Sequence, residues 1–207
     1  MEPITVTRKT TESEMTVILD FSPLKPDYRK HIDTPIPFLN HMIEHIAWRG
    51  GVNITAQVKL DQFVLTHVIC EDLGIALGKA AAEHIRRSQE KGIKGFGDAV
   101  GIIDEAKAEA AVSFESRVFF DLDPHAIFVP GEVEGMYSED LVTFLEGFAQ
   151  GAACTLQVDL LRGKNGHHIW EAVFRSVGSA LHEVFSCSAE RQGKTSGVAG
   201  KIEWEIQ

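Results

Sequence analysis

The chain has 207 residues, of which 44% are hydrophobic, and a formal net charge of −10 at pH 7. It is long enough for one sizeable core or for two half-size units that share one. Its acidic balance argues against a nucleic-acid or anionic-membrane surface, which needs clustered Lys and Arg, and no apolar run reaches the roughly 18 residues of a membrane helix. Three widely spaced cysteines favour reduced thiols, so we expect a cytoplasmic protein.

The first hundred residues predict two strands, a helix, a third strand and a second helix. Strands are predicted where apolar and polar residues alternate, and helices where apolar residues recur every three or four positions. Gly50 and Gly51 mark the end of the first helix. The predicted ranges are two strands within Ile4–Leu19, a helix over Pro37–Trp48, a strand over Val52–Leu60 and a helix over Glu71–Ile85.

The second half of the chain repeats the first. Residues 55–80 reappear at 155–180 with many identities, where chance would give roughly one or two. The segment around His41 also lines up, at a slightly different offset, with the segment around Phe144. We therefore expect an α/β (α+β) fold of tandem duplicated half-domains, each a mixed sheet covered by two helices. The expected halves are residues 1–98 and 99–207, packed helix face to helix face in one compact unit.

Each repeat places a histidine four residues before a glutamate, at His67 and Glu71 and again at His167 and Glu171. On a helix these positions share one face, so an imidazole and a carboxylate can converge on one cation. Such nitrogen and oxygen ligands suit zinc, manganese, iron or nickel. His168 projects about 100° away from its neighbour and would serve a different centre. One such pair is commonly a surface contact, but two at equivalent positions of a repeat favour metal binding.

Three runs of sequence resemble the imidazoleglycerol-phosphate dehydratase family. They are DTPIPFLNHM from Asp33, HVICEDLGIALG from His67 and GKNGHHIWEAVF from Gly163, and the match extends over nearly the whole chain. The resemblance implies ribosomal-protein-like halves and a hydro-lyase that dehydrates imidazole glycerol phosphate in histidine biosynthesis. It also implies one or two divalent metal ions per chain, most simply Mn²⁺, at subunit boundaries of a homo-oligomer that can reach twenty-four chains.

The same resemblance assigns roles to individual residues. The implied metal ligands are His41, His67, Glu71, His167, His168 and Glu171. Glu12 becomes a candidate acid/base, and the candidate phosphate contacts are Arg117, Lys164 and Lys194, of which arginine suits phosphate through its bidentate fork. The remaining histidines carry no such pattern and are expected to be structural or exposed, namely His31, His45, His84, His125 and His182.

The chain departs from the family pattern, as a divergent member would. Val68 stands where the family has a second histidine, Phe144 where it has a helix histidine, and Gly95 where it has an arginine. If the first two losses fall in the same centre, one four-ligand centre survives, with His41, His67, Glu71 and His168. The other would keep only His167 and Glu171, so we expect one tightly bound metal and little dehydratase turnover.

Two alternatives to the dehydratase stay open at this point. The first is a related lyase or isomerase that keeps one metal and acts on a different substrate, which the altered phosphate loop from Lys194 to Gly197 and the change at Gly95 favour. The second is a non-catalytic homologue that forms a shell or stores metal. Fold transfers through such replacements more readily than activity does.

Overall fold

The computed structural model describes residues 2–200, 202 and 205. The first half contains β1 (Ile4–Lys9), β2 (Ser13–Asp20), the 3-10 helix η1 (Tyr28–His31), β3 (Ile32–Asp33), α1 (Pro37–Gly50), β4 (Asn53–Leu60), α2 (Thr66–Ser88) and η2 (Gln89–Lys91). The second half contains β5 (Phe96–Ile103), β6 (Ala106–Ser113), β7 (Phe119–Asp123), β8 (Glu132–Val133), β9 (Met136–Tyr137), α3 (Ser138–Ala152), β10 (Thr155–Arg162), α4 (Gly166–Val184) and η3 (Ala189–Arg191).

The two halves build the same mixed sheet. The strand orders are β1-β2-β4-β3 and β5-β6-β10-β7, and in each sheet only the last strand is parallel to its neighbour. The expected duplication of a mixed-sheet half is therefore confirmed. The expected boundary between residues 98 and 99 lies within β5, the first strand of the second sheet.

The predicted helices and strands of the first half are present with small changes at their ends. The main difference is at α2, which begins at Thr66 rather than at Glu71. His67 therefore lies in the first turn of this helix, so that it and Glu71 are one helical turn apart on the same face. No helix within the described part of the chain has the length and apolar character needed to span a membrane.

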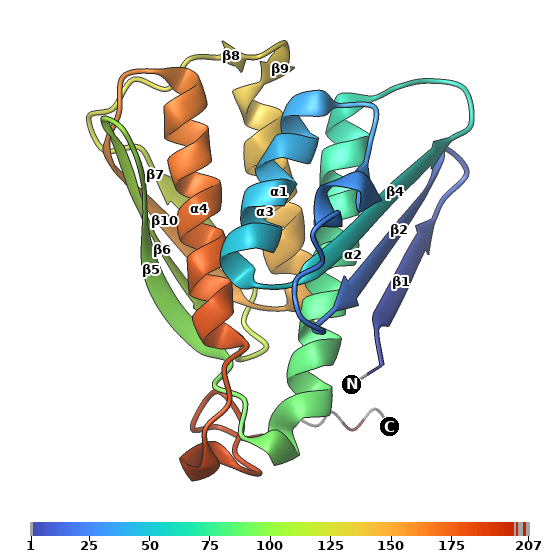
Figure 1. The fold of residues 1–207 in the computed structure, drawn as a ribbon, viewed down its shortest axis with the longest axis vertical. Coiled ribbons are helices and arrows are strands. Elements are labelled where there is room, and N and C mark those ends of the chain that lie inside the picture. Colours follow the sequence, from blue (N-terminus) through green and yellow to red (C-terminus); the bar gives the residue numbers. More distant parts are fainter. Residues whose placement is uncertain (1, 201, 203–204, 206–207) are drawn as a thin grey trace.

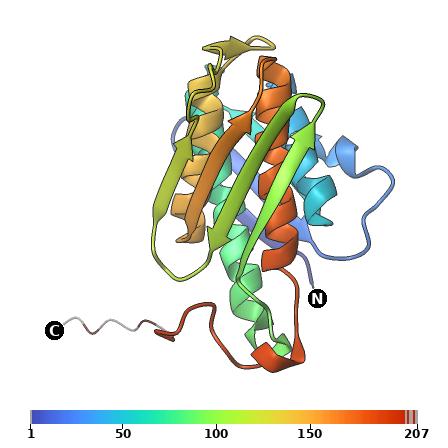
Figure 2. The same ribbon diagram turned by 90° about the vertical axis from the view of Figure 1, so that its left-hand side faces the viewer.

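The helices form the middle of the molecule and the sheets its two outer layers (Figure 1). α2 packs along α3, and α1 packs against α4, so each helix pair joins one half to the other. Among the described residues, no helix covers the outer face of the β5-β6-β10-β7 sheet (Figure 2). This arrangement confirms the expected packing of the halves, and it decides which side chains of the two repeats can meet.

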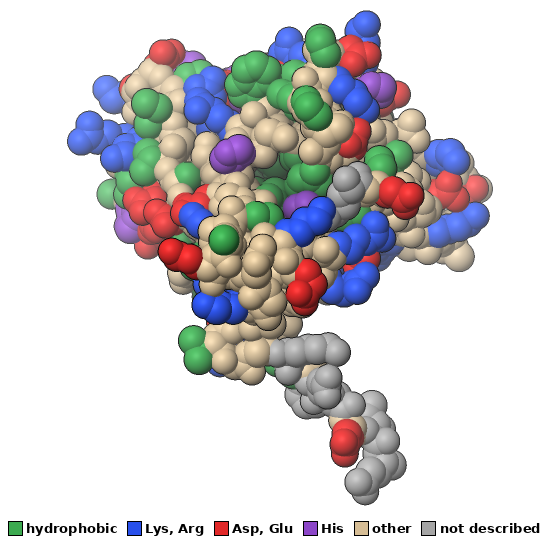
Figure 3. All heavy atoms as spheres, turned by 60° about the horizontal axis from the view of Figure 1, so that its bottom comes forward, with side chains coloured by type: hydrophobic (Ala, Val, Ile, Leu, Met, Phe, Trp, Pro, Cys, Tyr) green, Lys and Arg blue, Asp and Glu red, His purple; other side chains and the backbone are tan. Residues whose placement is uncertain are grey.

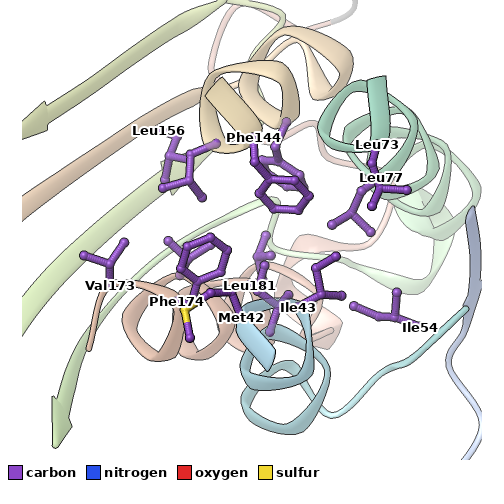
Figure 4. Close-up of a cluster of buried hydrophobic side chains, with 14 of the residues drawn as sticks. Met42, Ile43, Ile54, Leu73, Leu77, Phe144, Leu156, Val173, Phe174 and Leu181 are labelled. Carbon is purple, nitrogen blue, oxygen red and sulfur yellow. The ribbon is translucent and has the colours of Figure 1, made fainter. Parts of the chain in front are cut away.

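The core lies between the four helices. Phe144 and Phe174 pack ring to ring with centroids 5.8 Å apart, beside Leu73 and Leu77 of α2 (Figure 4). Burial of such large apolar side chains is the main favourable contribution to the stability of the fold. This aromatic pair belongs to the second half and lies against the leucines of α2, a helix of the first half.

The α2–α3 seam depends on glycines. A Cβ atom on Gly78 would overlap the carbonyl oxygen of Phe148 and approach the nitrogen of Ala152 to 2.6 Å. Gly151, on the facing helix, is equally close to the backbone of Ile75. The two helices can therefore approach backbone to backbone only because these positions lack a side chain.

We expect Gly78→Ala to lower the free energy of unfolding by about 1–3 kcal/mol, because the added methyl group must push α2 and α3 apart. The higher helix propensity of alanine acts in the opposite direction but is smaller, at about 1 kcal/mol. Gly131→Ala is the matched control, since a Cβ atom there meets nothing within 4 Å. Urea unfolding measures the free energies of unfolding of the two variants. Equal values would contradict the requirement for glycine at the α2–α3 contact.

Candidate metal centre

Three side chains of the predicted ligand set meet where α1 packs against α4. The ligand atoms of His41, His167 and Glu171 all lie within 4.8 Å of one another. Nε2 of His167 is 3.3 Å, and Nε2 of His41 is 3.8 Å, from Oε2 of Glu171. Two imidazoles and a carboxylate at such separations can bind one divalent cation after small side-chain rotations. The donor set therefore fits a divalent metal ion.

Glu171 is the centre of this group. Its side chain is only 6% exposed, and a carboxylate buried to this degree needs charged or hydrogen-bonding partners. Two partners come from outside the predicted set: Nε2 of His45 lies 3.3 Å from Oε1, and the Arg175 guanidinium contacts the same oxygen. Burial lowers the pKa of His45 to about 4, against the opposing effect of Glu171. The His45 ring is therefore neutral at pH 7.

The start of α4 is fixed by two acceptors, which also orient the adjacent histidines. The side chain of Asn165 accepts hydrogen bonds from the backbone N–H groups of His167 and His168, at 2.9 and 3.3 Å. Glu105 accepts the backbone N–H of Asn165 at 2.8 Å and lies 2.8 Å from Nδ1 of His168. His168 therefore points toward the β5–β6 turn, away from the group that contains His167.

These contacts also change the protonation of the pair. The backbone hydrogen bond from Asn165, followed by that with His168, lowers the pKa of Glu105 to about 2. The hydrogen bond with Glu105 in turn raises the pKa of His168. His168 is thus held by a carboxylate on the surface and takes no part in the group at Glu171 within one chain.

The first repeat does not build an equivalent group. The His67 side chain is 64% exposed, and its nearest acidic neighbour is Asp140, 3.8 Å away on α3. In the described part of the chain, neither His67 nor Glu71 belongs to a cluster of three candidate ligands. The residue of α3 that corresponds to His41 is Phe144, which is fully buried and cannot bind a metal.

Within one chain the structure does not bring His41 together with His67, Glu71 and His168. Because α1 packs against α4, His41 joins the His-Glu pair of the other repeat, at His167 and Glu171. In the same way α3 packs against α2, so the absence of a histidine at Phe144 affects the pair of His67 and Glu71 in the first repeat. The surviving group is therefore the one that the sequence reasoning had expected to be incomplete.

Two phosphate-contact candidates lie far from this group. Arg117 lines a cavity together with Thr195 and Ser196 of the C-terminal segment, and Lys194 lines an adjoining cavity of the same segment. This segment follows the last turn of α4, whereas His167 is in its first turn, and 19 helical residues span about 28 Å. Where it is described, this lower face mixes Lys and Arg with Asp and Glu side chains (Figure 3).

The other two substrate candidates also lie outside the group. Lys164 is exposed just before α4, where its backbone N–H donates to Glu105 at 3.2 Å. Glu12 is exposed in the β1–β2 turn, and its backbone N–H donates to the hydroxyl of Thr10 at 3.1 Å. One chain therefore brings together the metal-ligand candidates of one centre, but not the residues expected to bind or act on a substrate.

The sequence reasoning missed His45 and Arg175. Each carries a signal that can be recognised afterwards, because His45 follows His41 by four residues and Arg175 follows Glu171 by four.

A second group of candidate metal ligands consists of Asp123, His125 and Asp159, whose ligand atoms also lie close together. It lies on the surface, and its members are satisfied by ion pairs with one another.

The fold and the site together define a duplicated α/β protein with a candidate metal centre between the helices of its halves. The family model described as imidazoleglycerol-phosphate dehydratase matches residues 34–181. Curated imidazoleglycerol-phosphate dehydratases of Thioalkalivibrio sulfidiphilus and Burkholderia multivorans are 33% and 34% identical over 198 residues, covering 95% of this chain and 96% and 97% of theirs. The chain belongs to the imidazoleglycerol-phosphate dehydratase family.

Solved structures agree with this assignment. The crystal structure of the Pyrococcus furiosus enzyme superposes with a TM-score of 0.76 at 27% identity, covering 95% of this chain and 99% of that one. The Staphylococcus aureus enzyme superposes with a TM-score of 0.75 at 23% identity, covering 90% and 100%. The duplicated fold predicted from the sequence is thus the fold of these proteins.

We expect Phe144→His to add a second equivalent of bound Mn²⁺ per chain, because it places an imidazole on α3, the helix that packs against the one carrying His67 and Glu71. Phe148→His is the matched control, since it buries a histidine one turn further along the same helix. Metal analysis after dialysis measures both variants. The idea that α2 and α3 together can hold a second metal ion would be contradicted by a folded Phe144→His protein with no additional metal. An equal increase in bound metal in the Phe148→His control would also contradict it.

Proposed function

We propose that this chain dehydrates imidazole glycerol phosphate in histidine biosynthesis, with a divalent metal held by His41, His167 and Glu171. Membership of the dehydratase family supports the hydro-lyase activity over the two alternatives left open by the sequence. The observation that supports the metal dependence most directly is the meeting of these three side chains between α1 and α4. We propose Mn²⁺ as the metal, because imidazole and carboxylate groups are suitable ligands for this ion.

A cation bound here supplies positive charge that favours the anionic form of the substrate's imidazole ring and so the loss of the hydroxyl group. The imidazoles of His41 and His167 would hold the ion through ring nitrogens, and the buried carboxylate of Glu171 would offset part of the ion's charge. Glu12 is the proposed residue that moves the proton, as an exposed carboxylate can do. Arg117, Lys164 and Lys194 are the proposed phosphate contacts.

The position of these contacts supports a site shared between chains. Arg117 and Lys194 lie beyond the C-terminal end of α4, whereas His167 is in its first turn. A substrate that contacts both the metal ligands and these phosphate contacts must therefore lie between two chains. The outer face of the second sheet also exposes large apolar side chains, which suits burial against another subunit. These are Phe96, Val100, Ile102 and Phe119. We therefore propose a cytoplasmic homo-oligomer, up to a 24-mer.

We expect Glu171→Gln to lower both Mn²⁺ affinity and dehydratase turnover by more than about 100-fold, which is the upper range for losing a residue that only supports a metal ligand. Secondary structure should be unchanged, because the substitution removes a charge without creating a cavity. Asp159→Asn is the control, since it alters the exposed second cluster. Calorimetric Mn²⁺ titration and turnover of imidazole glycerol phosphate measure these effects.

Two outcomes would contradict this proposal. The proposed reaction is wrong if the unmodified protein, loaded with Mn²⁺, binds the ion and leaves imidazole glycerol phosphate unconverted. Alternatively, Glu171→Gln could retain full metal affinity while Asp159→Asn loses it, which would move the metal to the surface cluster.

A further inference from the structure

We infer that His45 is a metal ligand of this chain, so that one subunit supplies four protein donors to the centre at Glu171. The inference rests on the proposed metal dependence and extends it to a residue that neither the repeat pattern nor the family resemblance points to. His41, His167 and Glu171 form the group whose ligand atoms lie within 4.8 Å of one another, and the proposed fourth donor, His45, contacts two of its members, His41 and Glu171.

The distances around His45 are those of two ligands on one ion. Nε2 of His45 lies 3.3 Å from Nε2 of His41 and 3.3 Å from Oε1 of Glu171. With metal–nitrogen bonds of about 2.1 Å, neighbouring ligands of one ion lie roughly 3.0–3.5 Å apart. His45 therefore meets this requirement with two members of the group before any side chain moves.

Helix geometry explains why the fourth donor comes from this position. His41 and His45 are one turn apart on α1, and His167 and Glu171 are one turn apart on α4. The two helices approach closely, because Gly178 faces the His45 carbonyl, and a Cβ atom there would lie 2.9 Å from that oxygen. Two side chains from each helix thus face one another across a single contact.

The surroundings of the His45 ring favour a ligand over a surface histidine. Its side chain is 12% exposed, and its ring makes polar contacts with His41 and Glu171, the same residues that would hold the ion. The Nε2 atoms of His41 and His45 lie at hydrogen-bond distance, and only one proton fits between two such atoms. A cation between them would use both lone pairs.

The alternative is that His45 only orients Glu171 through a hydrogen bond. His45→Gln separates the two roles, because the amide of glutamine can still donate to a carboxylate but is a poor ligand for a divalent transition metal. His84→Gln is the matched control, since His84 is also a buried helical histidine and stacks on Phe21 away from the group.

The experiment uses the full chain with Mn²⁺ alone as the probe and no substrate. Titration gives the dissociation constant, and pulsed electron paramagnetic resonance counts the imidazole nitrogens coupled to the bound ion. We expect three coupled imidazoles in the unmodified protein and in His84→Gln. In His45→Gln we expect two, with Mn²⁺ binding weakened by more than about 100-fold.

The possible results separate this inference from the proposed function. Two coupled imidazoles in the unmodified protein, or an unchanged count in His45→Gln, would overturn the role of His45 and leave the metal dependence in place. If the unmodified protein binds no Mn²⁺, both the inference and the proposed metal dependence fail. The count in the unmodified protein decides the question even if His45→Gln does not fold.

Discussion

The buried carboxylate of Glu171 is the constraint on which the rest of the site depends. A carboxylate that is 6% exposed is stable only among partners, and this one has His41, His45, His167 and Arg175 around it. These partners come from two helices that belong to different halves of the chain. The fold must therefore hold α1 against α4 for this charge to be tolerated, and in doing so it gathers the donors of a metal centre.

The duplication creates two such helix contacts, and among the described residues a group of three candidate ligands forms at one of them. The α1–α4 contact holds the three donors of the candidate centre, whereas at the α2–α3 contact α3 carries the buried Phe144, which also packs against Phe174 of α4. An aromatic ring at this position adds apolar contact area to the core. At this contact a buried aromatic ring stands at the position that corresponds to His41, and the glycines of the same seam allow the helices to approach.

The sequence predicted more of the fold than of the site. Alternation and helical spacing located the elements, and the repeat around His67 and His167 gave the duplicated architecture. The same spacing identified both His-Glu pairs. What it could not give is which helices of the two halves touch, because that is decided by tertiary packing. The sequence analysis therefore noted that Val68 cannot bind a metal, but it did not identify His45, one turn after His41, as a possible ligand.

We propose that one metal ion binds between α1 and α4. Anomalous diffraction from crystals grown with Mn²⁺, recorded on both sides of the manganese absorption edge, would locate this ion. We expect one strong peak per chain, bounded by His41, His167 and Glu171, and no comparable peak beside His67 and Glu71. Peaks of equal height in both places, or a single peak beside His67, would contradict it.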